Sequence, residues 1–399
     1  MPSTDDFHHR RQSAARRRVY LQRRLAALVV AVVCAVVGYS IGNALGSSGA
    51  HGSAAAPGTT TRAGSTTSVT PRTPAPSSAR VSLTAVGDIM MGTPQFGLPP
   101  ANGSQLFTAV KPLLTGDVVL GNLEGTLTTR SGAKCGAGSS NCFAFQSPPA
   151  YVRNLVDAGF NVLNVANNHA YDFGPQGQAD TIRTLRGARI PDTGRPGRFA
   201  VLTTHGGVRV AVLGFSTYKW SNRMTDLPAA RALVRRAAAQ ADLVVVNMHA
   251  GAEGSGAQHV RPGTEYFLGE NRGDVIAFSH AVIDAGADLV VGNGPHVLRA
   301  MGFYKGRLIA FSDGNFVGWR AFSIGGVSGV SCVLHVTLGG DGRFISGDLK
   351  PVQLVGSGAP SPGGPAVGNV RALSQQDLRS GAAQIGADGS ITPPTAATG

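Results

Sequence analysis

The sequence predicts a layered α/β fold, in which helices cover a β-sheet core, preceded by one transmembrane helix. Two observations predict this. From residue 81 onward, short apolar runs rich in Val and Leu alternate with longer segments of helical periodicity, a pattern typical of strands covered on both faces. Nearer the N-terminus, residues 25–45 are 21 residues without a charge, and roughly 20 apolar residues suffice to cross a bilayer.

Length and composition exclude several classes of protein. The chain has 399 residues, of which 42% are hydrophobic and 14% charged, and only four are cysteine. A chain of this length can form two domains, or one large domain with tails. These values exclude a disulfide-dense mini-protein, a fibrous repeat, a fully disordered chain and a polytopic membrane protein.

The N-terminal segment predicts the orientation in the membrane. Residues 1–24 form a basic tail with seven arginines and two aspartates, and residues 25–45 follow it directly. Positive charge on this side places the tail in the cytoplasm and the rest of the chain outside the cell. The alternative is a signal peptide cleaved near Ala44, although its apolar core would be longer than the usual ~7–15 residues. Without interleaved aromatic residues, the arginines favour contact with anionic lipid rather than nucleic acid.

A linker and a disulfide are expected next. Residues 46–80 are rich in Gly, Ser, Thr, Ala and Pro and contain no acidic residue, as in a flexible extracellular spacer. Cys135 and Cys142 are expected to form a small-loop disulfide, because no second Cys or His pair accompanies them to complete a metal site. Cys34, in the apolar run, and Cys332, in a predicted strand, are expected to be buried apolar residues.

The folded domain is expected over residues 81–355, followed by a partly ordered C-terminal extension over residues 356–399. The expected strands are 81–86, 117–122, 161–166, 209–215, 242–248, 288–292 and 307–312. The expected helices are 105–114, 150–158, 176–187, 229–241 and 274–286. A hairpin over residues 331–355 is expected to close the sheet, and residues 370–378 form a short ordered segment.

Polar residues follow six of the predicted strands where each strand ends. The clusters contain Asp, Glu, Asn or His and lie at residues 87–92, 122–125, 167–172, 249–253, 293–296 and 313–315. Because the carboxyl ends of strands form the ligand crevice of an open α/β sheet, we expect these residues to converge on one site. Carboxylates, an amide oxygen and imidazoles suit Mn, Fe or Zn. A bridging carboxylate can hold two such ions about 3.5–4 Å apart for phosphate-ester hydrolysis.

Each of these residues also has a plain structural interpretation. Asp88 could cap a helix, Asn168 could sit in a turn, and His169 could be an ordinary loop histidine. The strand-end position that His169 shares with His249 and His296 favours function. The chain has no GxGxxG after its first strand, no GxxxxGK[ST] and no GxSxG, which disfavours nucleotide-binding folds and the serine hydrolases with a nucleophile elbow.

These motifs resemble those of the CapA family, the capsule and poly-γ-glutamate synthesis proteins, which look like a branch of the calcineurin-like metallophosphoesterases. The resemblance spans roughly residues 81–354 and implies a metallophosphoesterase-like fold. Its markers are GDIMMG (87–92), GNLEGTL (121–127), ANNHAYDFGPQG (166–177), MHAGAE (248–253), DAGADLVVGNGPHVL (284–298) and FSDGNF (311–316).

The resemblance implies a divalent-metal site of one or two ions, Mn, Fe or Zn, and a role for each matching residue. The implied metal ligands are Asp88, Glu124 (in the bridging position), Asn168, His249 and His296. The implied catalytic residues are His169, as acid or transition-state donor, with Asp172 and Glu253.

Three departures from the metallophosphoesterase pattern bear on the number of ions. Met90 stands where a histidine is usual, a departure shared with the CapA branch, and Gly294 replaces the first histidine of a His-Pro-His motif. Asp313 adds a carboxylate nearby. The loss of two imidazoles should weaken binding of one metal, so one ion, two weakly bound ions or none stay open.

The sequence therefore predicts a membrane-anchored extracellular protein of capsule or poly-γ-glutamate-type polymer synthesis or export, with a metal-dependent hydrolase-like site. Its substrate would be a phosphoester or an amide-linked polymer, and its net positive charge suits a polyanionic cell-surface polymer. A polymer synthase complex is a further expected partner, and nucleic acid is not. One alternative is a non-catalytic polymer-binding subunit of such a complex. Another is a structural wall protein with a vestigial site, against which the retained site residues argue.

Overall fold

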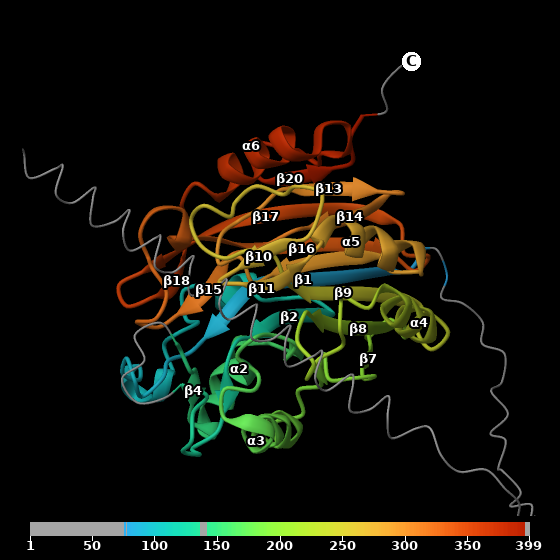
Figure 1. Cartoon of the computed structure of the whole chain (residues 1–399). Helices are drawn as coiled ribbons and strands as arrows, with labels where there is room; N and C mark the ends of the chain where they lie inside the picture. The colour runs from blue at the N-terminus through green and yellow to red at the C-terminus, as the bar shows by residue number, and fades with distance from the viewer. Residues whose placement is uncertain (1–75, 77, 136–141, 396–399) are drawn as a thin grey trace, which may run out of the picture. The chain divides into compact units, whose positions relative to one another are not determined.

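The computed structural model describes residue 76 and residues 78–135 and 142–395 (Figure 1). The predicted cytoplasmic tail, transmembrane helix and most of the linker lie outside the described residues. Among the residues described, no helix is both long enough and apolar enough to cross a membrane. The predicted disulfide between Cys135 and Cys142 is confirmed, and Cys332 is buried with a free thiol.

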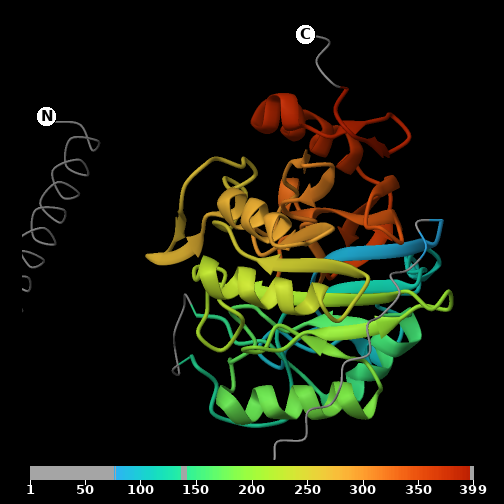
Figure 2. The ribbon, with the colours of Figure 1, turned by 90° about the vertical axis from the view of Figure 1, so that its right-hand side faces the viewer.

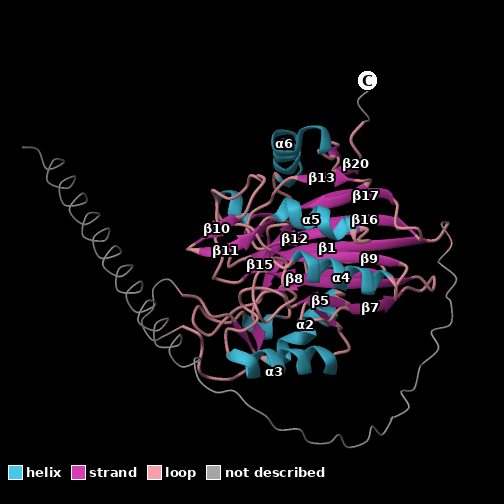
Figure 3. Cartoon of the chain, turned by 45° about the vertical axis from the view of Figure 1, so that its right-hand side comes forward, coloured by secondary structure: helices cyan, strands magenta, loops and turns pink. Residues whose placement is uncertain are grey.

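The strands within these ranges form two main sheets rather than the single one expected (Figures 1 and 3). The larger runs β19-β20-β17-β16-β1-β2-β5-β6, with β15 paired to β1 and β18 to β17. Its strands are β1 (Arg80–Met90), β2 (Val118–Leu123), β5 (Val162–Asn164), β6 (Asp192–Thr193), β15 (Asn315–Gly318), β16 (Val330–Gly339), β17 (Phe344–Val355), β18 (Ala359–Pro362), β19 (Gln384–Ile385) and β20 (Ser390–Thr392).

The smaller sheet runs β13-β14-β12-β9-β8-β7. Its strands are β7 (Ala200–Thr203), β8 (Arg209–Ser216), β9 (Leu243–His249), β12 (Leu289–Asn293), β13 (Met301–Tyr304) and β14 (Arg307–Ala310). Two short pairs accompany the main sheets: β3 (Thr126–Leu127) with β4 (Gln146–Ser147), and β10 (Glu265–Phe267) with β11 (Glu270–Gly273).

Alternating side chains bury both faces of each main sheet. On β1, Leu83 faces a core shared with the smaller sheet, whereas Val86 faces the outer core of the larger sheet. On β9, Val245 belongs to the shared core and Val246 to the outer core of the smaller sheet. Since the side chains of a strand alternate between its faces, apolar residues at successive positions give the continuous runs seen in the sequence. Such runs fit helices on both faces as well as a second sheet on one face, and here the second sheet covers that face.

Helices cover the outer faces. These helices are α2 (Val152–Ala158), α3 (Gly174–Gly187), α4 (Leu227–Ala238) and α5 (Val275–Asp284), whereas α6 (Ala366–Leu378) adds Ala366 and Val370 to the shared core. Side chains of α4 and α5 pack in the outer core of the smaller sheet, and those of α2 and α3 in the outer core of the larger. In the view of Figure 2, α4 and α5 lie in front of the strands.

One expected helix is wrong. Residues 105–114 form turns and a short 3₁₀ segment, Lys111–Leu113, instead of an α-helix. Pro112 lies inside this stretch and has no N–H for a helical hydrogen bond. The apolar residues there, including Leu106 and Phe107, are still buried in the outer core of the larger sheet. The other four expected helices, the seven strands, the hairpin β16–β17 and the ordered segment at 370–378 are confirmed.

The strand register brings the polar strand ends together. In the larger sheet, Asp88 on β1 pairs with Asn122 on β2 and with Asn315 on β15. In the smaller sheet, Asn293 at the end of β12 pairs with His249 at the end of β9. The two sheets meet at this edge, where Asn293 Nδ2 donates to the Val86 carbonyl over 3.3 Å. The predicted convergence of strand ends is therefore confirmed for these strands.

Candidate metal centre

Asp88 lies near the end of β1 and is fully buried. Asn122 Nδ2 donates to its Oδ1 over 2.7 Å, and the Gly294 N–H donates to its Oδ2 over 3.2 Å. Burial by itself would raise the pKa of Asp88, but contacts with His249 and His296 lower it below its usual range. Asp88 is therefore a charged carboxylate at neutral pH.

Glu124 directly follows β2 and is 1% exposed. Its Oε1 lies 3.6 Å from His296 Nε2 and 3.9 Å from the Nε2 atoms of both His169 and His249. Neither of its carboxylate oxygens has a hydrogen-bond partner among the described residues. Burial raises the pKa of Glu124 well above its ordinary value. A buried carboxylate without a partner is costly unless another group, such as a cation, completes its surroundings.

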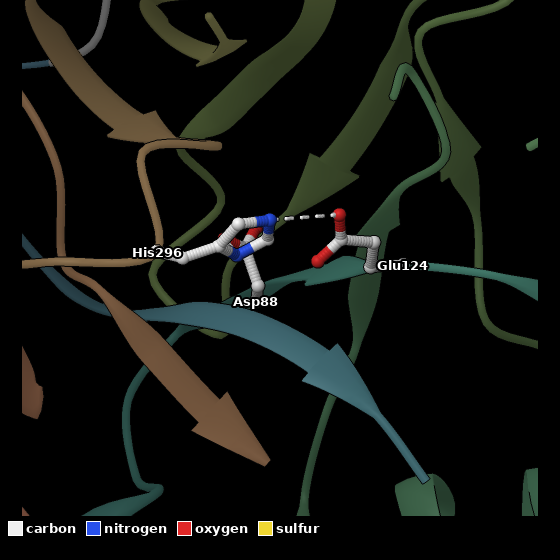
Figure 4. Close-up of side chains that lie close together, drawn as sticks. All are labelled: Asp88, Glu124 and His296. Atoms are coloured by element: carbon white, nitrogen blue, oxygen red, sulfur yellow. Dashed lines mark ion pairs between the residues drawn. The ribbon is translucent and has the colours of Figure 1, made fainter. Parts of the chain in front are cut away.

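His296 lies just after β12 in a left-handed backbone conformation with φ of 59°. Its Nδ1 lies 2.8 Å from Asn315 Oδ1 and 3.2 Å from Asp88 Oδ2, and Asn315 Nδ2 donates to its carbonyl oxygen. Burial by itself would lower the pKa of His296, but the charges on Glu124, Asp88 and Glu253 raise it to about 10. Figure 4 shows the His296 ring close to both Asp88 and Glu124. Such a strained backbone persists where the surroundings fix it.

His249 is the last residue of β9 and is fully buried. Its Nδ1 lies 3.1 Å from Asn122 Nδ2 and 3.5 Å from Asp88 Oδ1. Its Nε2 has no partner in the described part of the chain. Burial lowers the pKa of His249, so its ring is neutral at neutral pH, the form in which an imidazole binds metals.

His169 and Asp172 form a buried pair after β5. His169 Nδ1 lies 2.7 Å from Asp172 Oδ2, which also accepts the Phe145 N–H over 2.6 Å. Lys134 Nζ lies 2.7 Å from Asp172 Oδ1, and the Phe145 ring stacks on the imidazole with 3.9 Å between centroids. Burial lowers the pKa of His169 more than Asp172 raises it. These contacts hold the ring with Nε2 facing Glu124.

The remaining predicted residues, Asn168 and Glu253, adjoin this group. Asn168 precedes His169, and its Oδ1 is buried without a partner among the described residues. Glu253 Oε1 is ion-paired with Arg272 Nη1 over 2.8 Å, and its Oε2 lies 3.8 Å from His296 Nε2. Asp313, the added carboxylate of the sequence, instead accepts from the Cys332 thiol, and burial raises its pKa to about 8.

The residues fit a divalent metal ion. Ligand atoms of Asp88, Glu124 and His296 all lie within 4.8 Å of one another. With bonds of about 2.1 Å, two ligands of a tetrahedral ion are about 3.4 Å apart, close to the 3.6 Å between Glu124 Oε1 and His296 Nε2. His249 Nε2 and Asn168 Oδ1, both buried and unpartnered in the described structure, are donors of the same class. This set of donors suits Mn, Fe or Zn.

Sequence reasoning missed three residues of the site. Asn122 links Asp88 to a buried amide network, because its Oδ1 accepts from Asn164 and Asn167. Asn122 and Asn315 stood in the strand-end clusters, so the same positional signal could have found them. Arg272 comes from the β10–β11 hairpin, and no strand-end pattern pointed to it.

A cavity of about 550 Å³ opens beside the group. It is lined by Asn168, His169 and Glu253, and by three aromatic rings stacked in series, Tyr171, Trp220 and Tyr218. Neighbouring centroids in this stack are 5.0 Å apart. The cavity gives a substrate access to His169 and has an aromatic wall.

Comparison with known proteins identifies the relatives of this chain. Residues 82–319 match the family model described as bacterial capsule synthesis protein PGA_cap. The capsule biosynthesis protein CapA of Bacillus anthracis is 30% identical over 307 residues, which are 71% of this chain and 69% of that protein. The PGA biosynthesis protein CapA of Bacillus subtilis is 29% identical over 309 residues, 71% of this chain and 74% of that protein.

Among solved structures, the NAD nucleotidase of Haemophilus influenzae is similar with a TM-score of 0.38 and 13% sequence identity. The similarity covers 75% of this chain and 56% of the nucleotidase chain. This chain therefore spans just over half the length of that structure.

Proposed function

The chain belongs to the bacterial capsule synthesis protein family PGA_cap, and on that premise we propose that it acts in the synthesis or export of a capsule or poly-γ-glutamate-type surface polymer through a metal-dependent hydrolase-like site. One observation carries the proposal. The buried Glu124 carboxylate, which has no hydrogen-bond partner in the described structure, lies within 3.9 Å of the Nε2 atoms of three histidines. A cation would satisfy this carboxylate together with Nε2 of His249 and of His296.

In this proposal Asp88, Glu124, Asn168, His249 and His296 hold the ion. When bound, the ion would polarise a phosphoryl or carbonyl oxygen of the substrate and lower the pKa of a water molecule. Asn315 orients one of the ligands, because its Oδ1 contacts Nδ1 of the His296 imidazole, whose Nε2 faces Glu124. Outer partners of this kind fix the ring orientation of ligating histidines.

The His169–Asp172 pair moves the proton. Asp172 contacts Nδ1 of the ring, and Phe145 stacks on its face. Nε2 faces the centre, so once the ring is protonated it is the atom that would donate a proton to the leaving group. The side-chain exposure of His169 is only 9%, so bulk water has little access to that transfer.

For the cellular setting we propose the arrangement that the sequence predicts: a cytoplasmic tail, a membrane anchor and an extracellular domain that acts on a polyanionic polymer. A disulfide between Cys135 and Cys142 supports an oxidising compartment. The anchor would keep the domain close to a polymer that is synthesised at, or exported through, the membrane.

A second candidate is a non-catalytic polymer-binding subunit. The observation that favours a binding subunit is the small number of residues in the centre that could bind a metal ion. Met90, at a position where metallophosphoesterases usually have a histidine, is buried, and its Sδ accepts the Gly92 N–H over 3.2 Å. The described His, Cys, Asp and Glu residues yield one group that could hold a metal, and this group fits one ion more readily than two.

The turnover of the His169→Ala variant decides between a catalytic protein and a polymer-binding subunit. We would incubate the full-length chain and the variant with Mn²⁺ and, separately, a phosphodiester and poly-γ-glutamate. Catalysis predicts that the variant keeps its bound metal and loses turnover by about 10²–10⁴-fold. His280→Ala, a change on α5 away from the centre, is the matched control and should keep full turnover. Hydrolysis of neither substrate by the metal-loaded wild type, together with retained polymer binding, would favour the binding subunit.

A further inference from the structure

Arg272 is a buried cation beside the candidate metal centre. It lies on β11 and is 1% exposed, which makes it one of the two largest fully buried side chains, with Arg299, among the described residues. A buried guanidinium is costly unless its five N–H groups are satisfied. The way in which each arginine is satisfied is therefore informative.

The two buried arginines differ in whether their Nη2 atom has a hydrogen-bond partner. Arg299 is fully engaged: Nε donates to the Ala257 carbonyl, Nη1 to Glu265 Oε1, and Nη2 to Glu265 Oε2 and the Ala252 carbonyl. Its role is to join these loops. Arg272 provides a contrast within the same protein.

In Arg272, Nε donates to the Gly251 carbonyl over 2.9 Å, and Nη1 donates to Tyr218 Oη and contacts Glu253 Oε1, each over 2.8 Å. Nη2 is buried and has no partner anywhere in the described structure. The guanidinium is thus fixed on one side by three groups and leaves its second amino group unpaired.

The free Nη2 lies near the edge of the His249 ring. A Cβ added to Gly294 would lie 3.2 Å from Arg272 Nη2 and 3.1 Å from His249 Cδ2. Gly294 has φ of 107° and no side chain, so its backbone packs closely beside the guanidinium and the edge of the His249 ring that carries Nε2. Any other residue at position 294 would place its Cβ 2.9 Å from the Ala250 nitrogen, closer than this packing allows.

We propose that Arg272 binds an oxyanion of the substrate through Nη2, beside the residues that would hold the metal ion. This rests on the proposed function, since it assumes that the centre takes a substrate. Glu253 and Tyr218 are positioning residues in this scheme: they fix Nη1 and aim Nη2. Glu253, predicted from the sequence as catalytic, acts through Arg272.

The substrate group that Arg272 would bind is a phosphoryl or a carboxylate group. An arginine with one free, desolvated amino group gives a charge-assisted hydrogen bond to either, stronger than a bond between neutral groups. Inorganic phosphate and glutarate are therefore the two probes, one for a phosphoester source and one for the carboxylates of a glutamate polymer.

The experiment measures binding rather than turnover. The full-length chain is loaded with Mn²⁺, its metal content is determined, and each probe is titrated by calorimetry. Arg272→Lys and Arg272→Gln should weaken binding of one probe by about tenfold to a hundredfold with the metal content unchanged. Arg299→Lys, the buried arginine without a free nitrogen, should bind as the wild type does.

The outcomes separate this inference from the proposed function. Absence of metal in the wild type would contradict the proposed function, and the same titrations without metal would still test Arg272. A probe that binds equally to wild type and Arg272 variants, or wild type that binds neither probe, overturns the inference. Should the Arg272 variants not fold, Tyr218→Phe decides: a several-fold loss of affinity supports the assignment, and unchanged affinity refutes it.

Discussion

Replacing Asp172 tests the structural basis of the proton-donating pair without knowledge of the substrate. The Asp172 side chain is fully buried and makes three contacts: with His169 Nδ1 and Lys134 Nζ at 2.7 Å, and with the Phe145 N–H at 2.6 Å. In Asp172→Ala, a buried N–H loses its acceptor and the Lys134 ammonium loses its counter-charge. Removing one member of a buried charged network costs about 3–5 kcal/mol.

Two comparison variants sharpen this estimate. Asp172→Asn keeps an acceptor for the Phe145 N–H but loses the charge, so about half of the cost should remain. Lys134→Met removes a partner whose side chain is 37% exposed, and a partly exposed pair contributes about 1 kcal/mol or less. The expected order of destabilisation is therefore Asp172→Ala, then Asp172→Asn, then Lys134→Met.

The assay is urea-induced unfolding of the purified full-length chain, followed by tryptophan fluorescence at constant pH. Trp220 is a suitable reporter because its Nε1 donates to the Asn167 carbonyl, next to the site. An Asp172→Ala variant as stable as the wild type would refute the reasoning, since it would mean that the three contacts contribute nothing net. A Lys134→Met variant as unstable as Asp172→Ala would refute the assigned order.

Two further predictions concern the strands that carry the site. Burial raises the pKa of Asp288 to about 6 from its ordinary 3.8, despite hydrogen bonding from Val244 and the charge of Arg307. The contribution of Asp288 to stability is therefore fully present below pH 3.8 and declines as the pH rises to about 6. The wild type should lose about 3 kcal/mol more than Asp288→Asn between pH 3.5 and 7 in urea unfolding, and parallel pH profiles would contradict this. A Cβ at Gly87 would collide with the Gly314 carbonyl oxygen. Gly87→Ala should therefore lower the unfolding free energy by about 1–3 kcal/mol. An unchanged thermal midpoint would contradict the close approach of Gly87 to Gly314.

The strand pattern and the strand-end positions could be predicted because they depend on local sequence. Seven apolar runs were recognisable as strands, and the polar residues after them had a shared location at the carboxyl edge. Asp88, Glu124 and His249 were accessible to this reasoning and lie in one group in the structure. The site follows from strand geometry more than from any single motif.

The rest depends on contacts between segments that are distant in sequence. Division of the strands into two sheets does not change their apolar pattern, because a sheet and a helix cover a strand face equally well. Arg272 enters the centre from a hairpin, so its role depends on the fold around Gly251 and Tyr218. The pairing of Glu253 with Arg272 was inaccessible for the same reason.

The stretch around Pro112 shows the limit of periodicity. Leu106, Phe107 and Val110 are spaced as on one helix face and are buried as that spacing predicts. The backbone nevertheless forms turns, because burial of an apolar face does not require a regular helix and Pro112 interrupts the hydrogen-bond pattern.

The metal content of the purified chain tests the central claim most directly. We would measure Mn, Fe and Zn by elemental analysis in the wild type, Glu124→Gln and His249→Ala, with His280→Ala as the control. The proposed function predicts about one ion per chain in the wild type and the control, and loss of that ion in both site variants without loss of folding. A well-folded wild type that binds no metal under replete conditions, or site variants that bind as much as the control, would contradict it.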